Sequence, residues 1–342
     1  MNVAAPSTTG QNSPAQPPER RGPALGRAGE AVREWAIRNP MVLVMVLVIL
    51  YFLYMSDRFG TVGNLQTIAI AAAPFALIAL GQTLVILTGG IDLSVGSVIA
   101  ASAMTAALVV KDHPERMWLA VLAAVLVGVA VGAVSGFAVS RLGVPPFVAT
   151  LGMMTVASGL AYVLGNGAPI NGLPPGYSAI ANTKVFGIDL PVIIMILGFA
   201  IMIVLMSRTT YGLRVYAVGG NPLASRIAGL NVNRTLFSVY VISGGLAGLS
   251  GVILSSRVIS AFPSLGAGYE LDAIAAVVIG GASLMGGRGT VWGTILGLFL
   301  IQTLNNGLDL LIVPSYWQKV IKGVLIIAAV ALDVWVVRRR SR

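Results

Sequence analysis

Long runs of apolar residues, separated by short polar stretches, extend along almost the whole chain of 342 residues. Two examples lie at 41–55 and 117–138, and both are longer than the short apolar segments that form the core of a soluble protein. A helix needs about 20 mainly apolar residues to cross the hydrocarbon core of a bilayer. The pattern therefore predicts membrane-spanning helices and excludes a single soluble globule.

Ten apolar segments can be placed, and they predict an all-α polytopic membrane protein with about ten transmembrane helices. The third segment, at 94–110, and the eighth, at 270–285, have only 17 and 16 residues. Either one fits a tilted, re-entrant or broken helix, so nine or eight full crossings stay open as alternatives. The ten segments are 38–55, 65–88, 94–110, 117–140, 145–166, 190–207, 235–257, 270–285, 290–308 and 317–337.

The composition narrows the chemistry that the chain can carry. Hydrophobic residues make up 56% of it and charged residues only 10%, against about 25% in an ordinary soluble domain. Because there is no cysteine and a single histidine, His113 in a polar stretch, thiolate chemistry, histidine catalysis and multi-histidine metal sites are excluded. We expect no metal, no cofactor and no catalytic residue in this chain.

The net charge of +10 is best explained by membrane orientation. With the N-terminus placed in the cytoplasm, 15 of the 22 basic residues fall on the cytoplasmic side. Cytoplasmic loops carry an excess of Lys and Arg, so both termini are predicted to be cytoplasmic, with membrane lipid around the helices. The basic charge therefore requires no nucleic-acid partner.

Three regions follow from this arrangement. Residues 1–37, rich in Pro, Gly, Ala, Ser and Arg, are expected to form a disordered cytoplasmic N-terminal tail. Residues 38–337 form the transmembrane domain, in which 208–234 is a cytoplasmic loop. Residues 338–342 form a basic cytoplasmic tail.

The loop at 208–234 has four arginines, no acidic residue and the pattern of a short capped helix. Asn221 is a preferred N-cap, Pro222 suits the first helical turn, and Gly229 supplies a left-handed C-terminal stop. These signals predict a helix of about two turns. Its apolar stripe consists of Leu223, Ile227 and Leu230, and Arg226 precedes Ile227.

A helix this short is unstable alone in water, so it must pack against something. The membrane surface or the chain's own helix ends are one possibility, and a cytoplasmic partner into which the helix docks is the other. The sequence has no G-x-x-x-x-G-K-[ST] motif and thus no phosphate-binding loop. If the chain moves a solute against its gradient, a nucleotide-hydrolysing partner that pushes on this helix would supply the energy for that transport.

Acidic residues occur at the start of two apolar segments. Asp92 and Ser94 each fit an N-cap of the third segment, and Asp92 alternatively lines a solute path or gate, because a carboxylate against lipid is costly. Glu270 and Asp272 lie at the predicted start of the eighth segment, on the side away from the cytoplasm. They fit a solvated helix N-terminus, a gate, or a contact with an extracytoplasmic delivery protein.

Polar and small residues inside the segments predict close packing. Gln302, Asn305 and Asn306 project from the ninth segment, where neutral amides either bond across helices or line a polar path for a solute such as a sugar. Glycines spaced by four residues, in 128–136 and 244–251, place small residues on one helix face and let backbones approach.

Four stretches taken together resemble the permease subunits of ribose-type bacterial ABC sugar importers. The likeness covers about residues 40–337, and its two middle stretches are specific. The stretches are LGQTLVILTGGIDLSVGSV at 80–98, YAVGGNPLASRIAGLNV at 216–232, GYELDAIAAVVIGGASLMGGRGT at 268–290, and LNNGLDLL followed by SYWQKVIKGV near the end.

This resemblance implies a type II-like ABC importer permease architecture and a passive, gated path for a monosaccharide, ribose or a related sugar, across the bacterial inner membrane. It implies a second permease copy, identical or related, and a periplasmic sugar-binding protein. It also implies a cytoplasmic ABC ATPase with two cassettes, on which ATP and Mg bind. By similarity, the helix at 221–229 is the coupling helix.

The residues alone leave one competing function open. A self-sufficient ion-coupled carrier would use Asp92, Asp272 or Asp309 as its proton or cation site. An intramembrane enzyme is not indicated, because no pair of nucleophile and base and no metal cluster is evident in the sequence.

Overall fold

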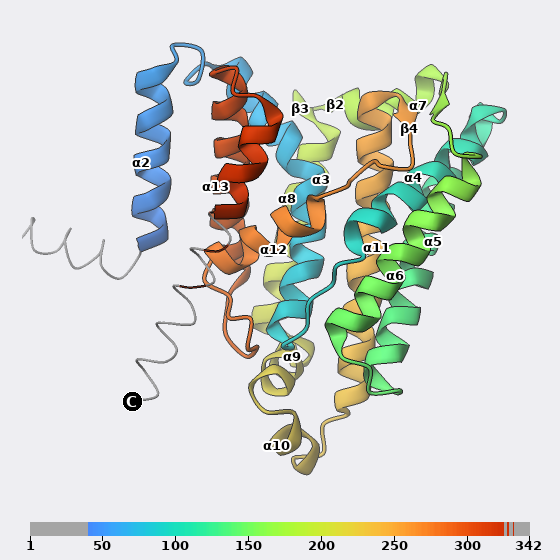
Figure 1. The fold of residues 1–342 in the computed structure, drawn as a ribbon, viewed down its shortest axis with the longest axis vertical. Coiled ribbons are helices and arrows are strands. Elements are labelled where there is room, and N and C mark those ends of the chain that lie inside the picture. Colours follow the sequence, from blue (N-terminus) through green and yellow to red (C-terminus); the bar gives the residue numbers. More distant parts are fainter. Residues whose placement is uncertain (1–39, 325–326, 328–330, 332–342) are drawn as a thin grey trace, which may run out of the picture.

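The computed structural model describes residues 40–324, 327 and 331, and most of these residues are helical. Long helices run side by side between two ends of the molecule, and the short helix α10 (Pro222–Ile227) lies beyond one of them (Figure 1). The expected tails at 1–37 and 338–342 lie outside the described residues.

The helices coincide closely with the predicted apolar segments. The fourth segment, predicted at 117–140, is the helix α5 with the same bounds, and the sixth, predicted at 190–207, is α8. The labelled helices are α2 Pro40–Met55, α3 Val62–Leu87, α4 Val95–Lys111, η1 Pro114–Arg116, α5 Met117–Ser140, α6 Pro146–Leu164, α7 Pro175–Asn182, α8 Leu190–Arg208, α9 Thr210–Gly220, α10 Pro222–Ile227, α11 Val232–Val258, α12 Tyr269–Ile279 and α13 Val291–Leu310.

Five of the described helical units are long and apolar enough to cross a membrane by length and composition. They are α3, η1 with α5, α6, α8 and α11, whereas α2 and α4 are apolar but shorter. The chain continues beyond α13 into a further helical stretch from residue 315. The predicted class, a helical protein with several membrane spans, is therefore confirmed, while the number of ten crossings stays a prediction.

Two helices begin part-way through the bundle (Figure 1). The chain leaves α3 at the α10 end, runs back without a helix over 90–94, and only then forms α4. After α11 the chain descends from the opposite end and forms α12 at about half depth. Because α12 has 11 residues, about 16 Å in length, it cannot cross the membrane alone. It ends at Ile279, and not at residue 285 as predicted.

The pair α5 and α11 shows why the glycines recur at four-residue spacing. A Cβ placed on Gly128 would collide with the carbonyl oxygen of Gly244, and one on Gly132 would collide with that of Tyr240. The two backbones are therefore in direct contact, as the sequence predicted, and van der Waals packing holds them together where lipid provides no hydrophobic drive.

Three small features were not predicted. The loop at 208–234 holds a second helix, α9, which precedes α10. The connection between α6 and α8 forms α7 and two strands, β2 (Lys184–Val185) and β3 (Ile188–Asp189), which pair antiparallel. The same connection also supplies β1 (Ile170–Asn171), which pairs antiparallel with β4 (Ser260–Ala261). Strands of two residues carry too little pattern to be recognised in a sequence.

Candidate functional site

Asp92 is buried in the extended segment that leads into α4, and it holds the start of that helix. Its Oδ1 accepts hydrogen bonds from the backbone N–H of Ser94 at 3.0 Å and from the Ser94 hydroxyl at 2.6 Å. Its Oδ2 accepts a hydrogen bond from the hydroxyl of Ser243 in α11 at 2.9 Å. These three donors explain how a carboxylate persists at this depth.

The backbone of the same segment is satisfied by side chains from two other helices. The Gln82 amide of α3, oriented to suit both partners, donates to the Asp92 carbonyl at 3.1 Å and accepts from the Asp92 N–H at 3.2 Å. The Thr150 hydroxyl of α6 donates to the carbonyl of Ile91 at 3.0 Å. Extended backbone inside a membrane needs such protein partners, because lipid offers none.

Asp272 of α12 is buried inside the bundle, whereas Glu270 is partly exposed. The Asp272 side chain accepts a hydrogen bond from Nζ of Lys322 at 2.9 Å, and both side chains are mostly buried. Glu270 accepts a hydrogen bond from the N–H of Gly268 at 3.2 Å. Both residues lie in the first turn of α12, which the chain reaches after descending over 262–268, so their role in a gate or in a contact with a delivery protein stays a prediction.

The starts of the two interrupted helices meet. A Cβ on Gly96, in the first turn of α4, would collide with the Glu270 carboxylate and with the carbonyl oxygen of Gly266. Helix N-termini carry partial positive charge, so the Glu270 carboxylate next to both starts is favourably placed. In membrane transporters, half-helices that end near the middle of the bilayer are typical of a solute pathway.

The three amides of α13 have different surroundings. Asn306 forms a reciprocal pair with Asn64 of α3, at 2.9 and 2.8 Å, so it bonds across helices. Within the part of the chain that the structure describes, Nε2 of Gln302 and Oδ1 of Asn305 are buried without a hydrogen-bond partner. The interpretation that these amides bond across helices therefore applies to Asn306. A role of Gln302 and Asn305 in a polar path stays a prediction.

The short helix α10 has the predicted caps. The Asn221 side chain accepts a hydrogen bond from the N–H of Ala224 at 2.9 Å, and Pro222 occupies the first turn. Gly229 has φ +82°, in the left-handed region, and the N–H of Leu230 donates to the Ser225 carbonyl at 3.0 Å. The local structure is confirmed, while its role as a coupling helix stays a prediction.

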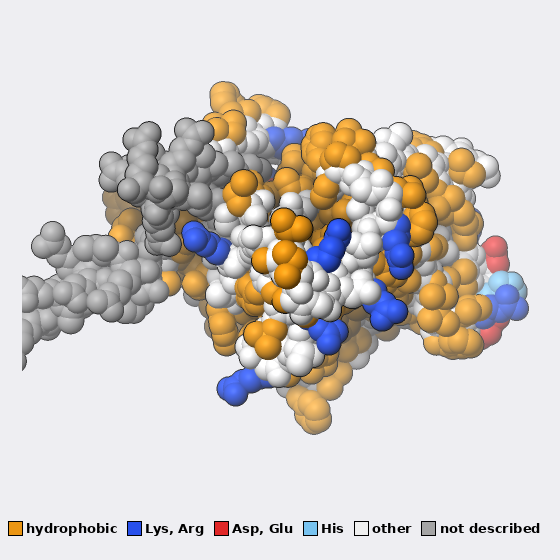
Figure 2. Space-filling model, turned by 90° about the horizontal axis from the view of Figure 1, so that it is seen from below, with side chains coloured by type: hydrophobic (Ala, Val, Ile, Leu, Met, Phe, Trp, Pro, Cys, Tyr) orange, Lys and Arg blue, Asp and Glu red, His pale blue; other side chains and the backbone are white. Residues whose placement is uncertain are grey.

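Two of the three residues in the apolar stripe of α10 are largely exposed in the described part of the chain. Leu223 is 69% exposed and Ile227 is 81% exposed. Figure 1 shows α10 beyond the ends of α5 and α6, so its own helix ends do not bury this stripe. Seen from that end, basic side chains surround apolar ones across the face (Figure 2). Exposed apolar residues rimmed by charge are typical of a protein contact.

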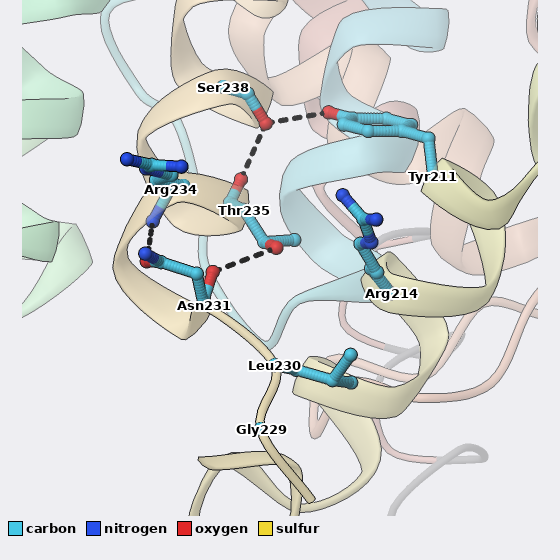
Figure 3. A pocket seen from close by; sticks show the side chains of 8 residues that line it. All are labelled: Tyr211, Arg214, Gly229, Leu230, Asn231, Arg234, Thr235 and Ser238. Carbon is cyan, nitrogen blue, oxygen red and sulfur yellow. Dashed lines mark hydrogen bonds between the residues drawn. The ribbon is translucent and has the colours of Figure 1, made fainter.

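A cavity of about 380 Å³ lies between α9, the chain after α10 and the start of α11 (Figure 3). The Tyr211 hydroxyl shares a hydrogen bond with Ser238 at 3.0 Å, and Ser238 donates to the Thr235 carbonyl at 2.8 Å. Burial raises the pKa of Tyr211 above its usual value, and the Ser238 contact partly offsets this. Arg214 and Arg234 also line the cavity, which is therefore basic.

The sequence analysis did not predict the roles of three residues that surround Asp92 and Asp272. Gln82 and Ser243 position the Asp92 segment, and Lys322 pairs with Asp272. Gln82 had a signal, because it is an isolated amide within a long apolar segment. Ser243 and Lys322 had none, because serines are common in packed helices and Lys322 lies near the start of the predicted segment 317–337, where basic residues are common.

Comparison with known proteins gives matches over most of the chain. Residues 64–330 match the family described as branched-chain amino acid transport system / permease component. The ribose import permease protein RbsC of Escherichia coli strain K12 is 41% identical over 308 residues, which cover 88% of this chain and 95% of that protein. RbsC of Bacillus subtilis strain 168 is 43% identical over 298 residues, 86% of this chain and 92% of that protein.

A relative named for another sugar is also similar. The D-allose transport system permease protein AlsC of Escherichia coli strain K12 is 35% identical over 299 residues, which cover 87% of this chain and 92% of that protein. No solved structure gives a significant match to the chain. The helical bundle, its apolar spans and these matches over nearly the full length show that the chain belongs to the branched-chain amino acid transport system / permease component family of integral membrane transport proteins.

Proposed function

We propose that this chain is the transmembrane permease subunit of an ABC importer for a monosaccharide, ribose or a related sugar. The observation that carries the proposal is the similarity to import permeases named for ribose and allose, which extends over more than four-fifths of the chain. A periplasmic binding protein delivers the sugar, and a cytoplasmic ATPase with two cassettes, which holds ATP and Mg, drives its passage.

In this proposal α10 is the coupling helix. Its exposed Leu223 and Ile227 insert into the ATPase, and Arg226 supplies charge at the rim of the contact. The caps at Asn221 and Gly229 keep these few residues helical in the absence of the partner, which lowers the ordering cost of docking.

The solute path runs past the start of α12. Ser264 and Ala267 are exposed in the stretch that descends to α12, and Leu271 is exposed in its first turn. Irregular backbone at this depth is tolerated where it borders protein or water, but not lipid. A second permease copy therefore faces this surface, and the sugar passes between the copies near Glu270.

The orientation follows from the same scheme. Both termini and α10 are cytoplasmic, and ten segments enter the membrane, of which α4 and α12 are interrupted helices. The arginines at the α10 end agree with the excess of basic residues in cytoplasmic loops.

Reconstitution tests the proposed function. The purified chain in liposomes, given only a proton or sodium gradient, should accumulate no ribose. Addition of the ATPase, the binding protein and ATP should start uptake of ribose or of a related sugar. Gradient-driven uptake by the chain alone would instead identify an ion-coupled carrier and refute the ABC assignment.

A further inference from the structure

A second cavity, of about 560 Å³, lies at the cytoplasmic ends of α5 and α11, where it shares Arg234 with the first cavity and has no lining residue from α10. We call it the α5–α11 cavity. It lies within one or two turns of the helix ends, at the level where lipid headgroups meet the cytoplasm in the proposed orientation. Its lining residues are Phe137, Ser140, Arg141, Asn233, Arg234 and Phe237.

The polar half of this cavity is basic. Arg141 comes from the end of α5 and Arg234 from the start of α11, and both side chains are exposed. Among the ion pairs of the described residues, neither guanidinium has a carboxylate partner. Guanidinium groups bind phosphate oxygens through paired N–H donors, so two of them in one cavity favour a phosphate group.

A buried hydroxyl points to the same kind of ligand. Ser140 is only 8% exposed, and its Oγ has no hydrogen-bond partner within the described part of the chain. Buried polar groups in native proteins nearly always have a partner. The Ser140 side chain lines the cavity, and a rotation about χ1 would turn its covered hydroxyl toward a phosphate oxygen held by Arg141, the next residue along α5.

The other half of the cavity is apolar and continues toward the membrane interior. Phe137 is 51% exposed and Phe237 is 37% exposed. Val134, about one turn farther along α5, is also exposed. A water-soluble nucleotide or phosphate has no group to cover this surface, whereas a lipid acyl chain does.

We propose that the α5–α11 cavity binds an anionic glycerophospholipid, with its phosphate on Arg141, Arg234 and Ser140 and an acyl chain along Phe137. Basic pockets between helix ends at the cytoplasmic face suit such headgroups, because charge and apolar surface are then both matched. The bound lipid would stabilise the contact between α5 and α11. The start of α11 is connected to α10 by residues 228–231.

Native mass spectrometry of the purified full-length chain tests the proposal with phosphatidylglycerol and phosphatidylcholine of identical acyl chains. The intact chain should retain phosphatidylglycerol at least about tenfold more strongly, a factor that corresponds to about 1.4 kcal/mol. The variant with both Arg141→Gln and Arg234→Gln should lose this preference. Arg208→Gln, which removes an arginine at the same end of the molecule outside the cavity, should keep it.

Two further experiments, on a Ser140 variant and on a soluble phosphate, make the result decisive. Ser140→Ala, a small change in a buried helix position, should weaken phosphatidylglycerol retention while the melting temperature in phosphatidylcholine stays unchanged. Glycerol phosphate should not displace the lipid, and displacement would reveal a site for a soluble phosphate and overturn the proposal. Equal retention of both lipids, or unchanged retention in the double variant, would also overturn it.

Discussion

At the scale of single residues, Asp92 tests whether a buried carboxylate is needed for its charge or for its acceptor atoms. Asn provides a side-chain oxygen for Ser94 and caps helices about as well, so Asp92→Asn should retain both folding and sugar uptake. Asp92→Ala leaves the donors of Ser94 and Ser243 unpaired and should destabilise the protein by about 2–4 kcal/mol. Thermal unfolding in detergent and uptake in liposomes measure both effects. A stable Asp92→Asn protein without uptake would assign the charge a transport role.

The pair of Asp272 and Lys322 makes a second residue-scale prediction. Lys322→Met leaves a buried carboxylate without its cation and should destabilise the protein by about 3–5 kcal/mol. Asp272→Asn combined with Lys322→Met should recover a large part of that loss, because neither charge is then unpaired. Thermal unfolding of the two single variants and the double variant measures the coupling. Additive losses would show that the two residues do not depend on each other.

At the scale of elements, the contact between α5 and α11 depends on the absence of side chains. Gly128→Val inserts atoms where the Gly244 carbonyl lies, so the helices must separate, at a cost of about 1–3 kcal/mol or more. Gly159→Val in α6 is the matched control, because no atom lies within 4 Å of a Cβ at that position. The melting temperatures of the two variants in detergent compare them, and equal values would contradict the close contact.

The short helix α10 gives a prediction about partner binding. Arg226→Glu reverses a charge on its exposed face, and Gly229→Pro forbids the left-handed C-terminal stop. Both variants should insert into the membrane normally but lose co-purification with the ATPase. Arg208→Glu, at the end of α8, should retain it. Unchanged co-purification of the Arg226 and Gly229 variants would remove the docking role.

The elements could largely be predicted from the sequence because each carries its own signal. The lengths of the apolar runs predict where α5 and α8 begin and end, and Asn221, Pro222 and Gly229 mark the ends of α10. The depth at which α4 begins could not be predicted, because it depends on partners that other helices bring. Gln82 bonds the extended chain at Asp92, and no local pattern records that these residues meet.

At the scale of the whole molecule, orientation can be tested with single cysteines, because the natural sequence has none. Phe186, in the turn between β2 and β3, is fully exposed, and Leu213 in α9 is 70% exposed at the other end. In intact spheroplasts a membrane-impermeant maleimide should label Phe186→Cys at once. It should label Leu213→Cys only after the membrane is opened. The reverse result would invert the proposed topology.

The helix α11 connects the short helix α10 with the chain that leads into α12, so a movement of α10 can be transmitted to α12. Four residues separate its start from the end of α10, and from its far end the chain leads through β4 and the stretch at 262–268 to α12. With 27 residues it is a rod about 40 Å long. A tilt of about 5° at the α10 end would displace the far end of such a rod by about 3.5 Å. A small rotation imposed from the cytoplasm thereby moves the chain that leads into α12. The displacement is comparable to the width of a water molecule.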